Sequence, residues 1–145
     1  MTRTAYDGAV RTPSPLDPHA EWELPAAPGT VGTIRNGVRD FARARGGSDA
    51  LLVDLALAVT EAVTNSVVHA FIDREPGIVR THIQAAADEL VVVVTDNGRG
   101  MQPRADSPGL GLGLPTIASV ADAISLSAGK NAGAKLSMSF ATGGG

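Results

Sequence analysis

The feature that most restricts the fold is the apolar run ELVVVVTD at residues 89–96, which is followed at once by the segment NGRG at residues 97–100. A short apolar run bounded by turn residues predicts a buried strand that is covered on both faces. The run ends on Asp96, and a carboxylate buried at a strand end is costly unless it is hydrogen-bonded. Gly98 and Gly100 allow the backbone to turn sharply and allow a flat ligand to approach closely. Two interpretations stay open: an Asp-Asn-Gly turn that ends a strand, or a ligand site.

The remaining segments predict an α+β fold. Apolar residues recur every three to four positions in three segments, which predicts helices, and further short apolar segments between turn signals predict strands. Thr30 and Ser48 are expected to cap the first two helices, and Pro115 is expected in the first turn of the third. The predicted helices cover residues 30–45, 49–71 and 114–122, and the predicted strands cover 21–24, 78–86, 89–96, 123–129 and 133–140. This order predicts a two-layer sandwich: a mixed, mostly antiparallel sheet with helices packed on one face.

Length and composition favour one domain and exclude several kinds of site. The chain has 145 residues, and we expect a flexible, proline-containing tail over 1–19, a domain over 20–141 and a loose tail over 142–145. The net charge of −3 gives no basic surplus, so nucleic acid is not expected as a direct partner. The chain has no cysteine, which excludes thiolate zinc sites and a cysteine nucleophile. No signal peptide and no uninterrupted membrane-length apolar run is visible, so we expect a cytoplasmic protein.

A polar stripe interrupts the long second helix. Glu61, Asn65 and His69 are spaced four apart, so they lie on one face, and Asp54 falls near the same line. The stripe points away from the apolar face, either into water or into a polar pocket. In a pocket, the carboxylate can accept a proton and the amide oxygen can bind a hard cation such as Mg²⁺. His69 is expected to pack nearby rather than to act directly.

The segment PGLGLGL at residues 108–114 is predicted to be the end of a glycine-rich loop that begins at Asn97. Gly109, Gly111 and Gly113 alternate with leucines just before a helix, where free N–H groups attract anions such as phosphate. A flexible hinge with inward-facing leucines is the alternative interpretation. The segment matches neither the Walker phosphate-binding pattern nor the dinucleotide fingerprint.

These elements, taken in order, resemble the GHKL ATPase superfamily and its Bergerat nucleotide-binding fold. The segment EAVTN is similar to its first motif, DNGRG and GLGLGL to its two glycine boxes, and GAKL to its final motif. Within the superfamily, the chain most resembles the anti-sigma-factor serine/threonine kinases of bacterial partner-switching systems. The segment LALAVTEAVTNSVVHAF carries that similarity.

The resemblance implies a role for each matching residue. Asp96 would accept a hydrogen bond from the adenine amino group, and Asn65 would coordinate the Mg²⁺ that bridges the phosphates of ATP. Glu61 would be the general base or would orient the attacking hydroxyl. Gly98 and Gly100 would line the adenine pocket, while the glycines of the second box would surround the phosphates, namely Gly109, Gly111 and Gly113. Arg104 is the one basic residue in the segment between the glycine boxes.

The resemblance also implies partners. The phosphoryl acceptor would be a serine or threonine on a STAS-type anti-anti-sigma antagonist protein, the second partner would be a sigma factor, and the kinase would form a homodimer. The apolar stripe of the first helix suits either a dimer or the internal core. Two alternatives differ in activity: a nucleotide-gated binding regulator that transfers no phosphate, and a detached histidine-kinase-like ATPase domain, whose phosphohistidine product would be labile to acid.

Overall fold

The computed structural model describes residues 18–73, 77–96, 108–128 and 134–142. These residues form three helices and five strands, in the order that the sequence predicted, and the α+β fold class is confirmed. The predicted strand over 89–96 matches β3 in both bounds. The elements are β1 (His19–Pro25), α1 (Pro28–Ala44), α2 (Asp49–Asp73), β2 (Ile78–Ala85), β3 (Glu89–Asp96), α3 (Pro108–Val120), β4 (Ala123–Ala128) and β5 (Ala134–Ala141).

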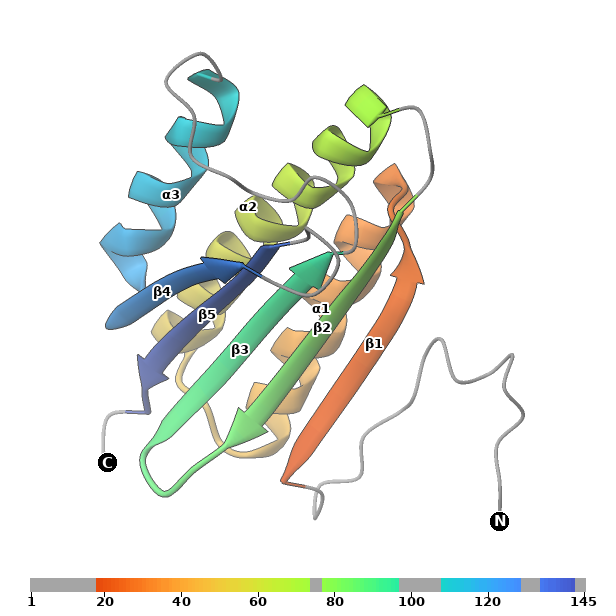
Figure 1. Cartoon of the computed structure of the whole chain (residues 1–145). Helices are drawn as coiled ribbons and strands as arrows, with labels where there is room; N and C mark the ends of the chain where they lie inside the picture. The colour runs from red at the N-terminus through yellow and green to blue at the C-terminus, as the bar shows by residue number, and fades with distance from the viewer. Residues whose placement is uncertain (1–17, 74–76, 97–107, 129–133, 143–145) are drawn as a thin grey trace, which may run out of the picture.

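The strands form one sheet in the order β1-β2-β3-β5-β4, and each pairing between the described strands is antiparallel. The three helices cover one face of the sheet, with α2 between α1 and α3 (Figure 1). The two-layer sandwich is therefore observed as expected, whereas the expectation of a mixed sheet is wrong for the described strands, because none of their pairings is parallel. The predicted terminal tails fall mostly outside the described residues.

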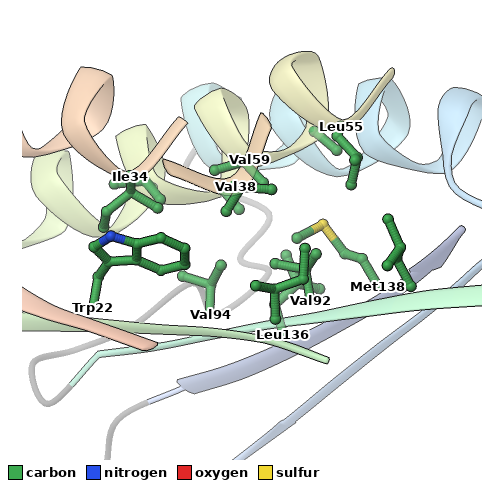
Figure 2. Close-up of a cluster of buried hydrophobic side chains, with 14 of the residues drawn as sticks. Trp22, Ile34, Val38, Leu55, Val59, Val92, Val94, Leu136 and Met138 are labelled. Carbon is green, nitrogen blue, oxygen red and sulfur yellow. The ribbon is translucent and has the colours of Figure 1, made fainter. Parts of the chain in front are cut away.

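The core lies between the sheet and the helices, and Figure 2 shows its central side chains. Along β3, buried residues alternate with half-buried ones, and the buried set consists of Leu90, Val92, Val94 and Asp96. The expectation that both faces of this strand are covered is thus wrong, because helices pack on one face alone. The apolar stripe of α1, which includes Ile34, Val38 and Phe41, belongs to this core rather than to an exposed dimer surface.

Two predictions about helix starts need correction. Thr30 does not cap α1: the helix begins at Pro28, and the Thr30 hydroxyl donates to the Pro25 carbonyl oxygen at 2.5 Å. Proline suits a first helical position because it needs no N–H partner there, so the helix can begin two residues earlier. Ser48 does cap α2, since the Leu51 N–H donates to its hydroxyl oxygen at 3.1 Å.

The second correction concerns the segment PGLGLGL. It was predicted as loop, but α3 begins at Pro108 and contains the segment, so Pro115 lies beyond the first turn. Pro108 again supplies a first-turn proline, which is favourable there despite the poor helix propensity of the glycines. Pro115 has no N–H to donate to the residue four positions earlier, so the helical hydrogen bonding is interrupted at that point.

Helix α2, with 25 residues, is the longest helix among the described residues. Its residues Asp49–Val68 have the length and hydropathy of a membrane span, although 56% of that stretch is buried inside the protein. It packs against both other helices and the sheet. Core helices of globular proteins share this composition, because a helix that is covered on most sides is apolar on most sides.

One close contact fixes α1 on the sheet. Trp22 of β1 is 2% exposed, and its ring lies against the backbone of α1 at Gly37. A Cβ atom at residue 37 would lie 2.5 Å from Cζ2 and 2.7 Å from Cε2 of that ring. Glycine in mid-helix costs stability relative to alanine, and here it leaves the space in which the indole ring packs.

Candidate functional site

The structure places Asp96 at the end of β3 on the face that the helices cover. Its side chain is 6% exposed, and its neighbours across the sheet are Val79 on β2 and Ala134 on β5. The Ser66 hydroxyl of α2 donates to Oδ2 of Asp96 over 3.2 Å. The prediction that Asp96 is a buried, hydrogen-bonded carboxylate is therefore confirmed.

The polar stripe of α2 faces into the protein at Asn65. This side chain is 8% exposed, so the solvated-face interpretation fails at this position. Its Nδ2 atom is buried and has no hydrogen-bond partner among the described residues. Glu61, one helical turn earlier, is half-buried. Because buried amides are rarely left unpaired, Asn65 has the property expected of a ligand-binding side chain.

The other predicted site residues lie on α3 or outside the described part of the chain. Gly109, Gly111 and Gly113 lie in the first two turns of α3, which packs beside α2. Gly98, Gly100 and Arg104 lie outside the described residues. His69 lies on α2, but its side chain is also outside the described part.

Asp54 does not join the site. It lines a shallow hollow at the opposite end of the sandwich, together with Asp122 and Thr142. Eleven residues of helix separate it from Asn65, a rise of about 16 Å. Asp54 and Asn65 lie on the same side of α2, as the spacing predicted. They are too far apart along the helix axis to line the same pocket.

Ser66 is the site residue that sequence reasoning missed. It is 2% exposed and lies at the position where the apolar stripe of α2, which includes Val59 and Val63, would place another apolar residue. A hydroxyl within an otherwise apolar helix face was the signal that could have identified it. Its partner Asp96 is 30 residues away in sequence.

Asn65, Ser66 and Asp96 form a buried polar group that is suited to recognising a polar ligand. An oriented carboxylate accepts hydrogen bonds strongly when water is excluded. The oxygen of a buried amide is a suitable ligand for a hard cation, and the Asn65 side chain therefore fits a site for Mg²⁺. Among the described residues, no three His, Asp or Glu side chains converge on a metal position.

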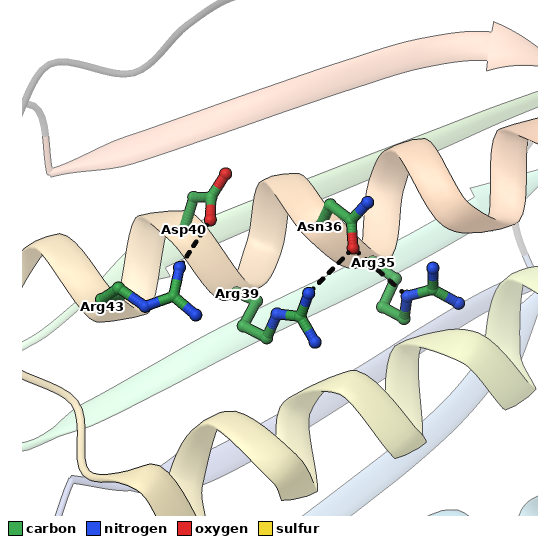
Figure 3. A network of polar contacts seen from close by, with 5 residues as sticks. All are labelled: Arg35, Asn36, Arg39, Asp40 and Arg43. Atoms are coloured by element: carbon green, nitrogen blue, oxygen red, sulfur yellow. Dashed lines mark hydrogen bonds and ion pairs between the residues drawn. The ribbon is translucent and has the colours of Figure 1, made fainter.

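Three arginines lie along α1, the half-buried Arg35 and Arg39 and the exposed Arg43, and Figure 3 shows their polar contacts. Arg35 and Arg39 both donate to the Asn36 side-chain oxygen, at 3.4 and 3.1 Å. Arg43 instead pairs with Asp40 at 2.8 Å. Within the described part of the chain, neither Arg35 nor Arg39 forms an ion pair with a carboxylate, and Nε of Arg39 is buried without a partner. We call Arg35 and Arg39 the cationic pair.

Comparison with known families gives one match that spans most of the domain. The sequence profile described as "Histidine kinase-like ATPase domain" matches residues 24–140. This range contains Glu61, Asn65, Ser66 and Asp96, so the whole described site lies inside the matched region.

Curated relatives share the same region. The chain is 37% identical over 98 residues to an anti-sigma F factor of Clostridium kluyveri, covering 60% of this chain and 68% of that protein. It is 30% identical over 96 residues to an anti-sigma F factor of Clostridium botulinum, covering 59% of this chain and 67% of that one. It is 41% identical over 76 residues to the serine-protein kinase RsbW of Listeria innocua, covering 52% and 48%.

Solved structures support the fold. The structure of the RsbU and RsbW domains of a Mycobacterium tuberculosis protein aligns with a TM-score of 0.68 at 20% identity, covering 86% of this chain and 32% of that one. A chain of the SiaB–SiaC complex of Pseudomonas aeruginosa aligns with a TM-score of 0.58 at 17% identity, covering 83% and 88%. At these identities the likeness concerns the arrangement of helices and strands.

Proposed function

Because the chain belongs to the histidine kinase-like ATPase domain family, we propose that it is an ATP-dependent serine/threonine protein kinase that acts as an anti-sigma factor. The observation that carries the proposal is the buried contact between α2 and β3, where Asp96 accepts a hydrogen bond from Ser66, next in sequence to Asn65, whose buried Nδ2 atom has no partner among the described residues. A buried polar group is costly unless it is hydrogen-bonded, and a ligand would supply the partner that the Asn65 Nδ2 atom lacks among the described residues. The named relatives include anti-sigma F factors and a serine-protein kinase.

In this proposal each residue has one task. Asp96 accepts a hydrogen bond from the adenine amino group, and Gly98 and Gly100 would line the adenine pocket. Asn65 holds Mg²⁺, which neutralises phosphate charge when bound. Gly109, Gly111 and Gly113 at the start of α3 leave room for the phosphates near the helix N-terminus.

Glu61 acts as the general base. The serine or threonine oxygen of the acceptor attacks the γ-phosphorus, the bond from that phosphorus to the β–γ bridging oxygen breaks, and ADP leaves. The hydroxyl proton passes to the Glu61 carboxylate, which is half-buried and one turn from Asn65. Positioning and charge neutralisation supply most of the rate, as in other phosphoryl transfers.

The proposed partners are a sigma factor and a STAS-type anti-anti-sigma antagonist that carries the acceptor residue. The cationic pair supports a docking surface for an acidic partner segment, because two half-buried arginines share one neutral oxygen instead of a carboxylate. A homodimer is part of the proposal, and the edge of β1 that faces away from β2 offers a surface for it. With such partners the protein would act in the cytoplasm.

The function is tested by phosphoryl transfer. The purified protein is incubated with Mg²⁺, γ-labelled ATP and a soluble proteome from its own source. One acid-stable labelled band supports the kinase and identifies its antagonist. An acid-labile band would indicate a histidine kinase instead. ATP binding without any labelled band would indicate a nucleotide-gated binding regulator.

Asp96→Asn is expected to weaken ATP binding by about 10- to 100-fold while the fold persists. The change removes a charged acceptor, and hydrogen bonds to charged groups contribute roughly 1.5–3 kcal/mol. Isothermal titration with ATP gives the affinity, and circular dichroism checks the fold. A folded variant with the affinity of the original protein would refute the role of Asp96.

Arg35→Glu is expected to weaken binding of the antagonist or the sigma factor by at least about tenfold, because reversing an unpaired interfacial charge creates repulsion. Arg43→Glu is the matched control: it makes the same charge change on the same helix, at a side chain that already pairs with Asp40. Both variants should keep ATP affinity. Equal losses of partner affinity in the two variants would show that only net charge matters.

A further inference from the structure

The pair formed by Ser66 and Asp96 joins the centre of the helix layer to the end of the central strand. The two side chains are 2% and 6% exposed, and the Ser66 Oγ lies 3.2 Å from Oδ2 of Asp96. This hydrogen bond joins two buried polar side chains, one on α2 and one at the end of β3. Burial places both groups in a low-dielectric environment, where the electrostatic attraction between them is stronger than in water.

The Ser66 hydroxyl has two acceptors but only one proton to donate. The Ala62 carbonyl oxygen lies 3.4 Å away, at the position that a helical serine commonly uses. Asp96 is closer and charged, and charge-assisted hydrogen bonds are about twice as strong as neutral ones. The Ser66 hydroxyl proton is thus directed to Oδ2 of Asp96. This hydrogen bond from α2 restricts the orientation of the Asp96 carboxylate.

Packing alone does not require a hydroxyl at residue 66. Ala58 and Ala62 are fully buried on the same helix and show that a methyl group is sufficient beside the core. A buried serine and a buried acid cost desolvation free energy that an apolar pair would not. This cost points to a ligand that uses the oriented acid.

We propose that Ser66 is a positioning residue for base recognition: by donating to Oδ2 it fixes Asp96 in the orientation that meets the exocyclic amino group of a purine. The inference rests on the proposed function, since it names how that site reads the nucleotide. It assigns Ser66 an effect on affinity and base selectivity, and no effect on the rate of transfer. It also predicts that the hydroxyl acts through Asp96 alone.

The test compares two nucleotides. ATP carries the amino group, whereas inosine triphosphate has a carbonyl oxygen in its place. Ser66→Ala is expected to weaken ATP binding about tenfold, as for loss of one hydrogen bond to a charged group. Binding of inosine triphosphate should change less than about threefold, and kcat should stay unchanged. Ser66→Thr keeps the hydroxyl and should restore most of the ATP affinity.

A double-variant cycle separates positioning from general stability. Ser66→Ala combined with Asp96→Asn should bind ATP no more weakly than Asp96→Asn alone. Thr60→Ala removes a half-buried hydroxyl from the same helix and serves as the control, with no expected change. Ser66→Cys, which keeps a side chain of similar size, replaces Ser66→Ala if the alanine variant does not fold.

The outcomes distinguish failure of the role proposed for Ser66 from failure of the proposed kinase function. Equal loss of both nucleotides, or fully additive losses in the double variant, would overturn the role of Ser66 and leave the kinase function standing. The same conclusion follows if Ser66→Ala binds ATP as well as the original protein. Failure of the original protein to bind ATP at all would overturn both.

Discussion

Glu61→Gln is expected to slow phosphoryl transfer by about 10²- to 10⁴-fold while ATP affinity changes less than about threefold, the usual range for loss of a general base. Glutamine keeps the size and hydrogen-bonding reach of the side chain but cannot accept the hydroxyl proton. Glu61 lies one helical turn before Asn65 and is half-buried, so it can meet an acceptor hydroxyl at the rim of the site. The buried groups that hold the nucleotide stay in place.

Asp54→Asn is the matched control for this prediction. It makes the same type of change on the same helix, also at a half-buried carboxylate, but at the opposite end of the domain. Single-turnover transfer from γ-labelled ATP to the antagonist gives the rate, and titration gives the affinity. If both variants transfer phosphate at the original rate, Glu61 is not the base. If Glu61→Gln mainly loses ATP affinity, its role is in binding.

Gly37→Ala is expected to destabilise the folded domain by about 1–2 kcal/mol. Overpacking a core typically costs 1–3 kcal/mol, and here the added carbon would lie 2.5 Å from a rigid indole ring that has no exposed side to turn to. The better helix propensity of alanine recovers about 1 kcal/mol at most. A drop in Tm of roughly 3–8 °C follows for a domain of this size.

Gly29→Ala provides the comparison within α1. A Cβ atom at residue 29 has no neighbour within 4 Å, so this variant should be as stable as the original protein or slightly more stable. Thermal and urea unfolding measure both. If Gly37→Ala matches Gly29→Ala, Trp22 has room to shift and does not fix the position of α1. Trp22→Phe in the Gly37→Ala background should recover part of the loss, because the smaller ring leaves space for the new methyl group.

Much of the fold could be predicted because its signals are local. The periodicity of residues 49–71 and the run over 89–96 gave α2 and β3 nearly residue for residue. The family resemblance read from the spacing of EAVTN, DNGRG and GLGLGL is confirmed by the match over residues 24–140 and by the kinase and anti-sigma relatives. Short motifs with fixed spacing survive in sequence because a ligand site requires them together.

Features that depend on distant contacts were not predictable. The reason for Gly37 is Trp22 on another element, and the reason for Ser66 is Asp96, 30 residues later. The start of α3 was placed too late because the glycines of residues 109–113 signal loop by propensity, while the helix forms against α2. In each case tertiary packing decides what the local sequence leaves open.

The strict alternation along β3 has a consequence for how such proteins diverge. Asp96 shares a face with Leu90, Val92 and Val94, so removing or adding one residue within the strand would turn the acid to the outer side of the sheet. Such a change would keep composition and much of the core yet abolish the site. Over evolutionary time, length changes should therefore accumulate in the turn at residues 86–88 and after Asp96, and should be absent between them. A homologue with one residue more or fewer between Leu90 and Asp96 is expected to have lost the inward-facing acid and with it the site.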